Sequence, residues 1–128
     1  MFNTLLVEDN ASFRQALSDI LFSYFPSIGV EEAGDGEEAL GKVEYQRPDL
    51  IFMDIQLPGK NGLEVTKEIR LVYDDIVIVI LTSYGLPEYR QQAFRNGADC
   101  YISKTDNSCL QKILRRVAEA MAVFLRNR

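Results

Sequence analysis

Leu50-Ile51-Phe52-Met53 and Ile76-Val77-Ile78-Val79-Ile80-Leu81 are two unbroken runs of apolar residues. A strand with one face in water alternates polar and apolar residues, whereas an unbroken run is typical of a strand that is covered on both faces. Such strands occur in parallel sheets that have helices on both sides. Weaker apolar segments at Thr4–Val7 and Cys100–Ile102 extend the pattern, and Val30–Ala33 carries two glutamates, which predicts an edge strand.

Amphipathic patterns with the helical spacing i, i+3, i+4 lie between these segments. They predict helices over residues 13–24, 37–46, 61–73, 87–96 and 110–124. Asn10 or Ser12 would cap the first helix, and Val72 would be buried by the third. Asp106 or Asn107 would cap the last helix. Because strand and helix alternate five times with short connections, we expect one α/β domain over residues 1–128, a (βα)5 fold with a doubly wound, five-stranded parallel sheet.

The composition is that of a globular protein with an acidic body. The 128 residues are 47% hydrophobic and 26% charged, and the net charge is −5 although residues 110–128 hold five basic residues and one acidic residue. The acidic remainder disfavours direct nucleic-acid binding by this domain. The absence of histidine excludes Ser-His and Cys-His catalysis and histidine metal sites. We expect a cytoplasmic protein that does not bind membranes, because we find no secretory signal, membrane span or CxxC pair.

Reactive side chains follow four of the five predicted strands. Glu8-Asp9 follows the first strand, Asp54 the third, Thr82-Ser83 the fourth and Ser103-Lys104 the fifth. The carboxyl ends of parallel strands share one edge of a sheet, so three carboxylates should meet there and repel one another. A magnesium ion, which prefers oxygen ligands, and the ammonium of Lys104 would together balance their charge. The sequence therefore predicts an Mg²⁺ site at this edge.

Five segments, in order and with family-like spacing, resemble the receiver domain of two-component response regulators. They are Leu5–Asn10, Ala33–Leu40, Pro48–Gly62, Ile80–Ser83 and Gly97–Lys104. The resemblance spans essentially the whole chain and implies the flavodoxin-like strand order 2-1-3-4-5. The segment that ends in Lys104-Thr105 is most similar to receivers that carry a LuxR-type DNA-binding output domain, and it lacks the proline that follows the lysine in many receivers.

The resemblance also implies roles for individual residues. Asp54 would accept a phosphoryl group from a sensor histidine kinase, and Lys104 and Thr82 would contact that group. Four groups would hold Mg²⁺: Glu8, directly or through water, Asp9, Asp54 and the backbone carbonyl of Gln56. Tyr101 matches the aromatic switch position, and Gln56 and Tyr84 lie where side chains tune the lifetime of the phosphoryl group.

Some alternatives stay open at this point. Gln56 and Tyr84 are also compatible with a plain surface loop, and Tyr101 with a side chain packed in one rotamer. The chain as a whole is also compatible with a receiver that is never phosphorylated, or with a phosphohydrolase that uses an aspartate nucleophile. Expected partners are the kinase, a second copy bound through the Pro87–Phe124 face, and a C-terminal DNA-binding output domain outside this chain.

Overall fold

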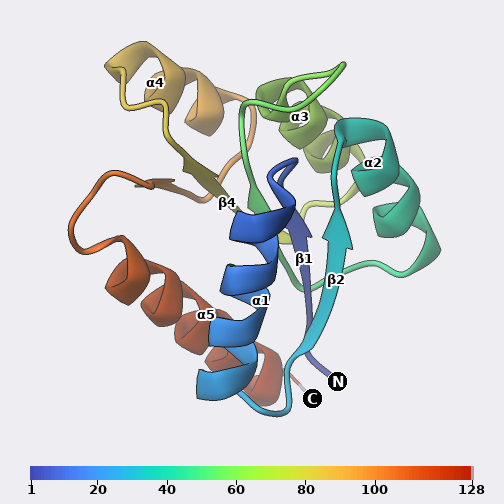
Figure 1. Ribbon diagram of the computed structural model, residues 1–128. Coiled ribbons are helices and arrows are strands. Elements are labelled where there is room, and N and C mark those ends of the chain that lie inside the picture. The colour runs from blue at the N-terminus through green and yellow to red at the C-terminus, as the bar shows by residue number, and fades with distance from the viewer. Residues whose placement is uncertain (128) are drawn as a thin grey trace.

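The computed structural model describes residues 1–127 and contains a single five-stranded sheet flanked by helices (Figure 1). The elements alternate along the chain as predicted. They are β1 (Asn3–Val7), α1 (Ala11–Tyr24), β2 (Gly29–Ala33), α2 (Gly36–Tyr45), β3 (Leu50–Met53), α3 (Gly62–Val72), β4 (Val77–Thr82), α4 (Pro87–Arg95), β5 (Cys100–Ser103) and α5 (Cys109–Arg126).

All strand pairs are parallel, and the strand order is β2-β1-β3-β4-β5. The order 2-1-3-4-5 is therefore confirmed, and β2 is an edge strand as its glutamates predicted. The central strand β3 is buried along its whole length, which explains why its sequence contains no polar residue.

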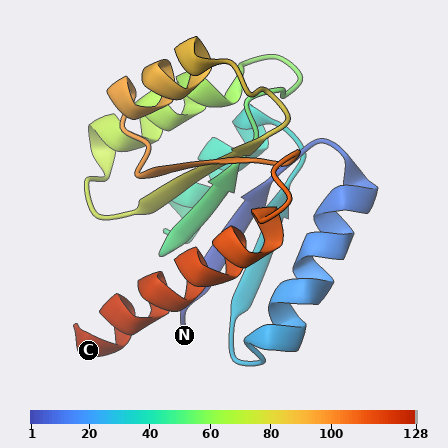
Figure 2. The same ribbon diagram turned by 90° about the vertical axis from the view of Figure 1, so that its left-hand side faces the viewer.

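Two separate hydrophobic cores cover the two faces of the sheet. Successive side chains of a strand point to opposite faces, so Leu5 and Val7 of β1 join one core and Leu6 joins the other. The first core is completed by α2, α3 and α4, and the second by α1 and α5. Figure 2 shows α1 and α5 on one side of the sheet, opposite α3 and α4.

The helices begin and end close to the residues predicted from the sequence, but the predicted start of α5 and the predicted burial of Val72 need correction. Asn10, not Ser12, caps α1, since its side chain accepts a hydrogen bond from the N–H of Phe13 at 3.0 Å. The prediction for α5 was wrong: the helix begins at Cys109 after Ser108, because Asp106 instead bonds the backbone and hydroxyl of Ser108 in the preceding turn. The prediction that Val72 is buried was also wrong, because α3 ends at this residue and leaves its side chain 72% exposed.

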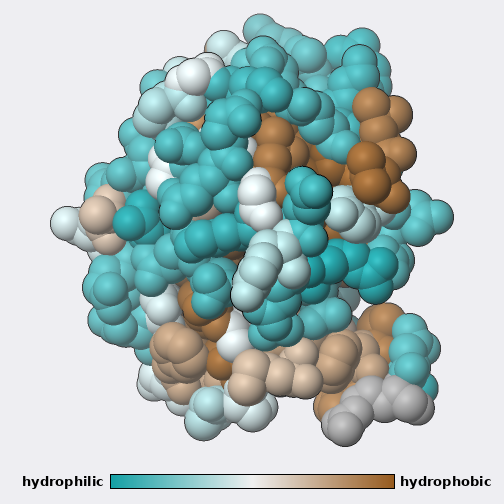
Figure 3. Space-filling view, turned by 90° about the vertical axis from the view of Figure 1, so that its right-hand side faces the viewer, coloured by the Kyte–Doolittle hydropathy of each residue, from teal (hydrophilic) through white to brown (hydrophobic). Residues whose placement is uncertain are grey.

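The surface on the α2 side of the molecule is mainly hydrophilic, with smaller apolar areas (Figure 3). Among residues 1–127, no helix combines the length and the apolar character needed to cross a membrane.

Candidate functional site

Three carboxylates meet at the edge of the sheet where the strands end. Glu8 and Asp9 directly follow β1, and Asp54 directly follows β3, the neighbouring strand. One oxygen from each carboxylate lies within 4.8 Å of the others. Glu8 and Asp54 are buried, whereas Asp9 is exposed. The predicted convergence of these three acids is thus present in the structure.

Lys104 enters the same site from the segment after β5. Its ammonium donates a hydrogen bond to Asp54 Oδ2 at 3.1 Å and a second one to Glu8 Oε1. Burial alone would lower the pKa of Lys104, but the hydrogen bond to Glu8 and the charge of Asp54 raise it above its usual value. Lys104 therefore stays charged, and one positive charge faces three carboxylates.

Several neighbouring groups act on the carboxyl group of Glu8. Burial raises the pKa of Glu8 above its usual value, although hydrogen bonds from Lys104 and from the backbone N–H of Asn10 act in the opposite direction. The nearby charge of Asp54 raises it further. A cation bound beside Glu8 would favour its ionised form, because the positive charge stabilises the carboxylate.

The acids and Lys104 line an open depression, together with residues from the loop after β3. Its lining consists of Glu8, Asp9, Asn10, Asp54, Gln56, Leu57, Pro58, Ser83 and Lys104. Every titratable member is a carboxylate except Lys104, and the neutral members add oxygen atoms of Asn10, Gln56 and Ser83. This donor set contains no sulfur or imidazole and suits a hard divalent cation such as Mg²⁺.

Helix α3 reaches the site through a close backbone contact. Gly62, its first residue, packs so tightly against Asp54 that an added Cβ would lie 1.9 Å from the carbonyl oxygen of Asp54. The N–H of Gly62 also donates to the carbonyl of Ile55 at 2.8 Å. A glycine at this position is therefore required for the observed path of the chain on both sides of Asp54.

The remaining predicted residues lie beside the depression and do not line it. Thr82 is fully buried at the end of β4, and its hydroxyl accepts a hydrogen bond from the N–H of Tyr84 at 3.4 Å. Tyr101 of β5 donates from its hydroxyl to the carbonyl of Tyr84, and burial raises the pKa of this phenol. Arg90 of α4 lies over the ring of Tyr101, 5.8 Å from its centroid. Thr82, Tyr84 and Tyr101 thus form one connected group between the site and α4.

Three residues at the start of α1 contact the site, and the sequence reasoning missed them as site residues. The N–H of Asn10 donates to Glu8 Oε2 at 3.0 Å, and the ring centroid of Phe13 lies 4.3 Å from the ammonium of Lys104. The guanidinium of Arg14 donates to the carbonyl oxygen of Glu8 at 2.6 Å. The sequence feature that could have indicated a site residue is Arg14. It is a charged residue beside Phe13 and Leu17, which pack in the core, on the helix that directly follows two acids.

Comparison with protein families identifies the kind of domain that carries this acidic site. Residues 4–115 match the model of the response regulator receiver domain. The chain belongs to this family. The receiver domain is 35% identical to response regulator MprA of Mycobacterium leprae over 113 residues, which cover 88% of the chain and 48% of that protein. It therefore spans about half the length of the curated relatives it matches.

Solved structures confirm the CheY-like, flavodoxin-like fold of the receiver domain. The response regulator TrrA of Thermotoga maritima, in complex with Mg²⁺-BeF, superposes with a TM-score of 0.81 at 33% identity, over 94% of this chain and 99% of that chain. A LuxR-family two-component response regulator of Aurantimonas sp. gives a TM-score of 0.79 at 28% identity, over 98% of this chain and 86% of that one. The predicted similarity to LuxR-type receivers is in line with this second relative.

Proposed function

We propose that this receiver domain accepts a phosphoryl group on Asp54 from a sensor histidine kinase in an Mg²⁺-dependent reaction, and thereby controls an output domain or partner. The observation that supports this most directly is the position of Asp54. Its carboxylate ends the central buried strand, one oxygen faces the ammonium of Lys104 at 3.1 Å, and the depression beside it is open to solvent. Asp54 is only 6% exposed, but it lines this depression, which gives a phosphodonor a path to its carboxylate.

In the proposed reaction a carboxylate oxygen of Asp54 attacks the phosphorus atom. The bond between phosphorus and the donor nitrogen breaks, its electron pair stays on that nitrogen, and the product on this chain is an acyl phosphate. Lys104 lies where it can pair with an oxygen of the transferred group. Mg²⁺, when bound, would neutralise charge on the carboxylates and on the phosphoryl oxygens. Glu8, Asp9, Asp54 and the carbonyl of Gln56 are the groups we assign to hold it.

The hydroxyl of Thr82 and the ring of Tyr101 are assigned to the switch. Thr82 would turn toward the phosphoryl group and give up the N–H of Tyr84, which would free space beside Tyr101. Gln56 and Tyr84 flank the site from two loops, and we assign them to control of water access and therefore of the lifetime of the acyl phosphate. On this account the domain is regulatory, and its only chemistry is phosphoryl transfer to itself and loss of that group.

The curated relatives are about twice as long as this chain, which supports an output domain outside it as the controlled partner. A DNA-binding response regulator among the solved structures supports a DNA-binding one. The LuxR-family relatives support the same assignment. A second copy of the chain, bound through the Pro87–Phe124 face, is the other partner we propose.

Incubation with Mg²⁺ and a small phosphodonor such as acetyl phosphate tests the proposal. We expect one phosphoryl group per chain by intact mass, none with the Asp54→Asn variant, and none without the divalent cation. Asp49→Asn is the matched control, because Asp49 is the acid at the opposite end of the same strand and accepts a backbone hydrogen bond that an asparagine oxygen can also accept. No modification of the wild type would indicate an interaction domain that is never phosphorylated. Continuous turnover of the donor would indicate a phosphohydrolase.

A further inference from the structure

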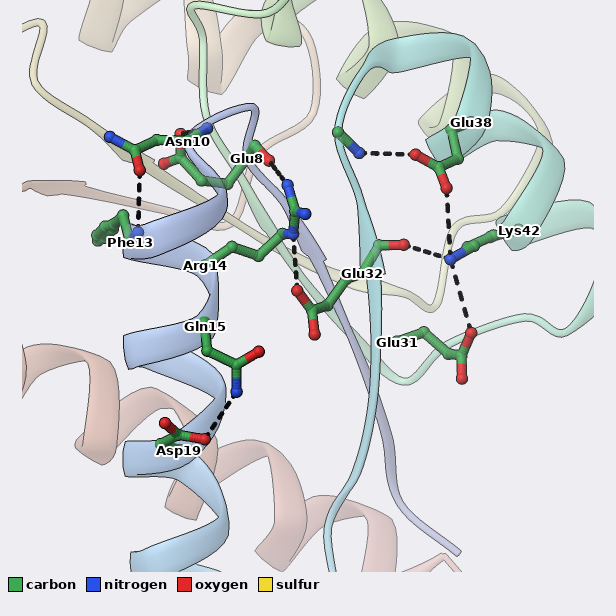
Figure 4. Close-up of polar contacts among 11 residues, drawn as sticks. Glu8, Asn10, Phe13, Arg14, Gln15, Asp19, Glu31, Glu32, Glu38 and Lys42 are labelled. Carbon is green, nitrogen blue, oxygen red and sulfur yellow. Dashed lines mark hydrogen bonds and ion pairs between the residues drawn. The ribbon is translucent and has the colours of Figure 1, made fainter.

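Arg14 connects the acidic turn after β1 with the edge strand β2. It lies in the first turn of α1, and its side chain is 20% exposed. One guanidinium nitrogen, Nη1, donates to the carbonyl oxygen of Glu8 at 2.6 Å, and Nε donates to Glu32 Oε1 at 2.7 Å (Figure 4). The two contacts use different edges of the planar guanidinium, so the side chain joins the turn after β1 to β2 in a fixed orientation.

The carbonyl that Arg14 holds belongs to the peptide group between Glu8 and Asp9. On its other side Glu8 is fixed as well, because its N–H donates to the carbonyl of Ala33 in β2 at 2.9 Å. The carboxylate of Asp9 makes no hydrogen bond or ion pair with any side chain in residues 1–127. The direction in which Asp9 presents its carboxylate therefore depends on the orientation of this peptide group.

The far end of the bridge is itself supported. Glu32 lies opposite Leu6 in the register of β1 and β2, and its carbonyl accepts a hydrogen bond from the ammonium of Lys42 in α2. Lys42 also pairs with Glu31 at 3.8 Å and with Glu38 at 3.6 Å (Figure 4). The carboxylate of Glu32 neutralises the guanidinium, so Arg14 does not replace the cation that the three acids require.

We propose that Arg14, held by Glu32, is a positioning residue for the divalent cation: it fixes the Glu8–Asp9 peptide and so sets the direction of the Asp9 carboxylate. This inference rests on the proposed function, since it assumes that these acids hold Mg²⁺. Removal of the bridge leaves every proposed ligand in place but lets the Asp9 carboxylate sample orientations that do not bind. Loss of groups that orient metal ligands typically weakens metal binding by about 10-fold or more.

A second arginine in the same fold provides a matched control. Arg70 of α3 also has a 20% exposed side chain, donates from Nε to a backbone carbonyl, that of Gly97, at 2.9 Å, and pairs with Asp99 at 2.8 Å. It has the same chemistry as the Arg14 bridge but no contact with the acidic turn. Arg70→Ala therefore measures what a structural arginine costs when it is removed.

The test is a titration of ¹⁵N-labelled protein with Mg²⁺ alone, followed by the amide shifts of Asp9, Asn10 and Asp54, with urea unfolding of each variant measured in parallel. We expect Arg14→Ala to raise the Kd for Mg²⁺ about 10-fold. Glu32→Gln should raise it less, and the double variant should bind no more weakly than Arg14→Ala, because the two residues act through one bridge. Arg70→Ala should lower stability and leave the Kd of the wild type unchanged.

An Arg14→Ala variant with the wild-type Kd would overturn the inference, as would an equal loss of affinity in Arg70→Ala. If Arg14→Ala does not fold, Arg14→Lys and Glu32→Gln decide the matter, and an unchanged Kd in both would overturn it. Failure of the wild type to bind Mg²⁺ is a different result. It would remove the proposed function itself and the inference with it.

Discussion

The buried carboxyl group of Glu8 links cation binding to pH. Because the pKa of Glu8 is raised, its carboxyl group in the metal-free protein keeps its proton at pH values above the ordinary glutamate value of 4.5. A raised pKa contributes stability below the pKa of the unfolded chain, and that contribution is lost as the pH rises through the folded value. Mg²⁺ requires the ionised form, so its binding should release a proton.

We therefore expect the affinity for Mg²⁺ to fall as the pH is lowered toward 4.5, because Glu8 takes up a proton above that pH. Calorimetric titrations at several pH values would measure this. The loss should begin above 4.5, and Glu8→Gln should bind more weakly but with less pH dependence in that range. A wild-type affinity that stays constant as the pH is lowered to 4.5 would contradict the prediction.

Phe13 offers a second test on a single side chain. Its ring faces the Lys104 ammonium at 4.3 Å, and such a cation–π contact contributes about 0.5–2 kcal/mol. Phe13→Leu keeps an apolar side chain but removes the ring, so urea unfolding should show a loss of about 1 kcal/mol from this contact in addition to the packing loss. In a Lys104→Met background that additional loss should disappear. Strictly additive effects of the two substitutions would mean that the ring only fills space.

For single residues, the sequence was sufficient to predict that the titratable side chains of the site lie together. It was not sufficient to identify the neighbouring residues that contact them. Asp54, Glu8 and Lys104 were predictable because parallel strands all end at one edge. The contacts of Phe13 and Arg14 depend on how the first turn of α1 is rotated over the acidic turn, and periodicity alone does not determine that rotation. The roles assigned to the residues of the site remain predictions.

Among the helices, Gly41 of α2 and Gly62 of α3 differ in whether a larger side chain can replace them. An alanine at Gly62 would place its Cβ against the backbone of Asp54, whereas Gly41 is exposed within α2 and has no atom within 4 Å of an added Cβ. Gly62→Ala should lower the free energy of unfolding by at least about 2 kcal/mol. Gly41→Ala should raise it by about 0.5–1 kcal/mol, because alanine favours the helix. Urea unfolding of both variants checks this, and a harmless Gly62→Ala would mean that α3 can move away from Asp54.

Element boundaries were predictable where a single cap or breaker decides them. Asn10 and Pro87 begin their helices as expected, and Gly97 ends α4 with a positive φ of 108°. The start of α5 was not predictable, because Asp106 has more than one partner. Its carboxylate accepts from Ser108 and from the ammonium of Lys112, which together hold its pKa well below the usual range.

For the molecule as a whole, alternation of apolar runs with helical patterns was sufficient for the (βα)5 fold. It was not sufficient for the strand order, which entered through the resemblance to receiver domains, because periodicity says nothing about which strands are neighbours. The proposed interface with a second copy, the Pro87–Phe124 face, is also a property of the whole molecule. It lies at the β5 edge of the sheet, at the opposite end from α2 (Figure 1).

Helix α4 is the element best suited to change on that face. Its first turn has no side-chain cap, and Ala93 is its single buried residue. An element with so little buried surface is expected to shift at low free-energy cost. Arg90 packs over the rings of Phe94 and Tyr101, so rotation of Tyr101 would remove one of its two aromatic contacts. Phosphorylation at Asp54 would then alter the packing of α4 through Thr82 and Tyr101, as a shift between two states.

Dimer formation through this face is therefore expected to depend on phosphorylation and on Phe94, which is 42% exposed beside Arg90. With Mg²⁺ and beryllofluoride, sedimentation should show that the wild type dimerises, while amide exchange changes in α4, β5 and α5. Phe94→Asp should stay monomeric, because a charge in the interface would be buried without a partner. Tyr45→Asp is the control, since Tyr45 is 91% exposed on α2 at the other end of the sheet, and it should dimerise like the wild type. Both variants should still form the acyl phosphate with acetyl phosphate.

A wild type that remains monomeric with unchanged amide exchange would rule out this face as the output. Loss of the dimer in Tyr45→Asp alone would place the interface on the α2 side.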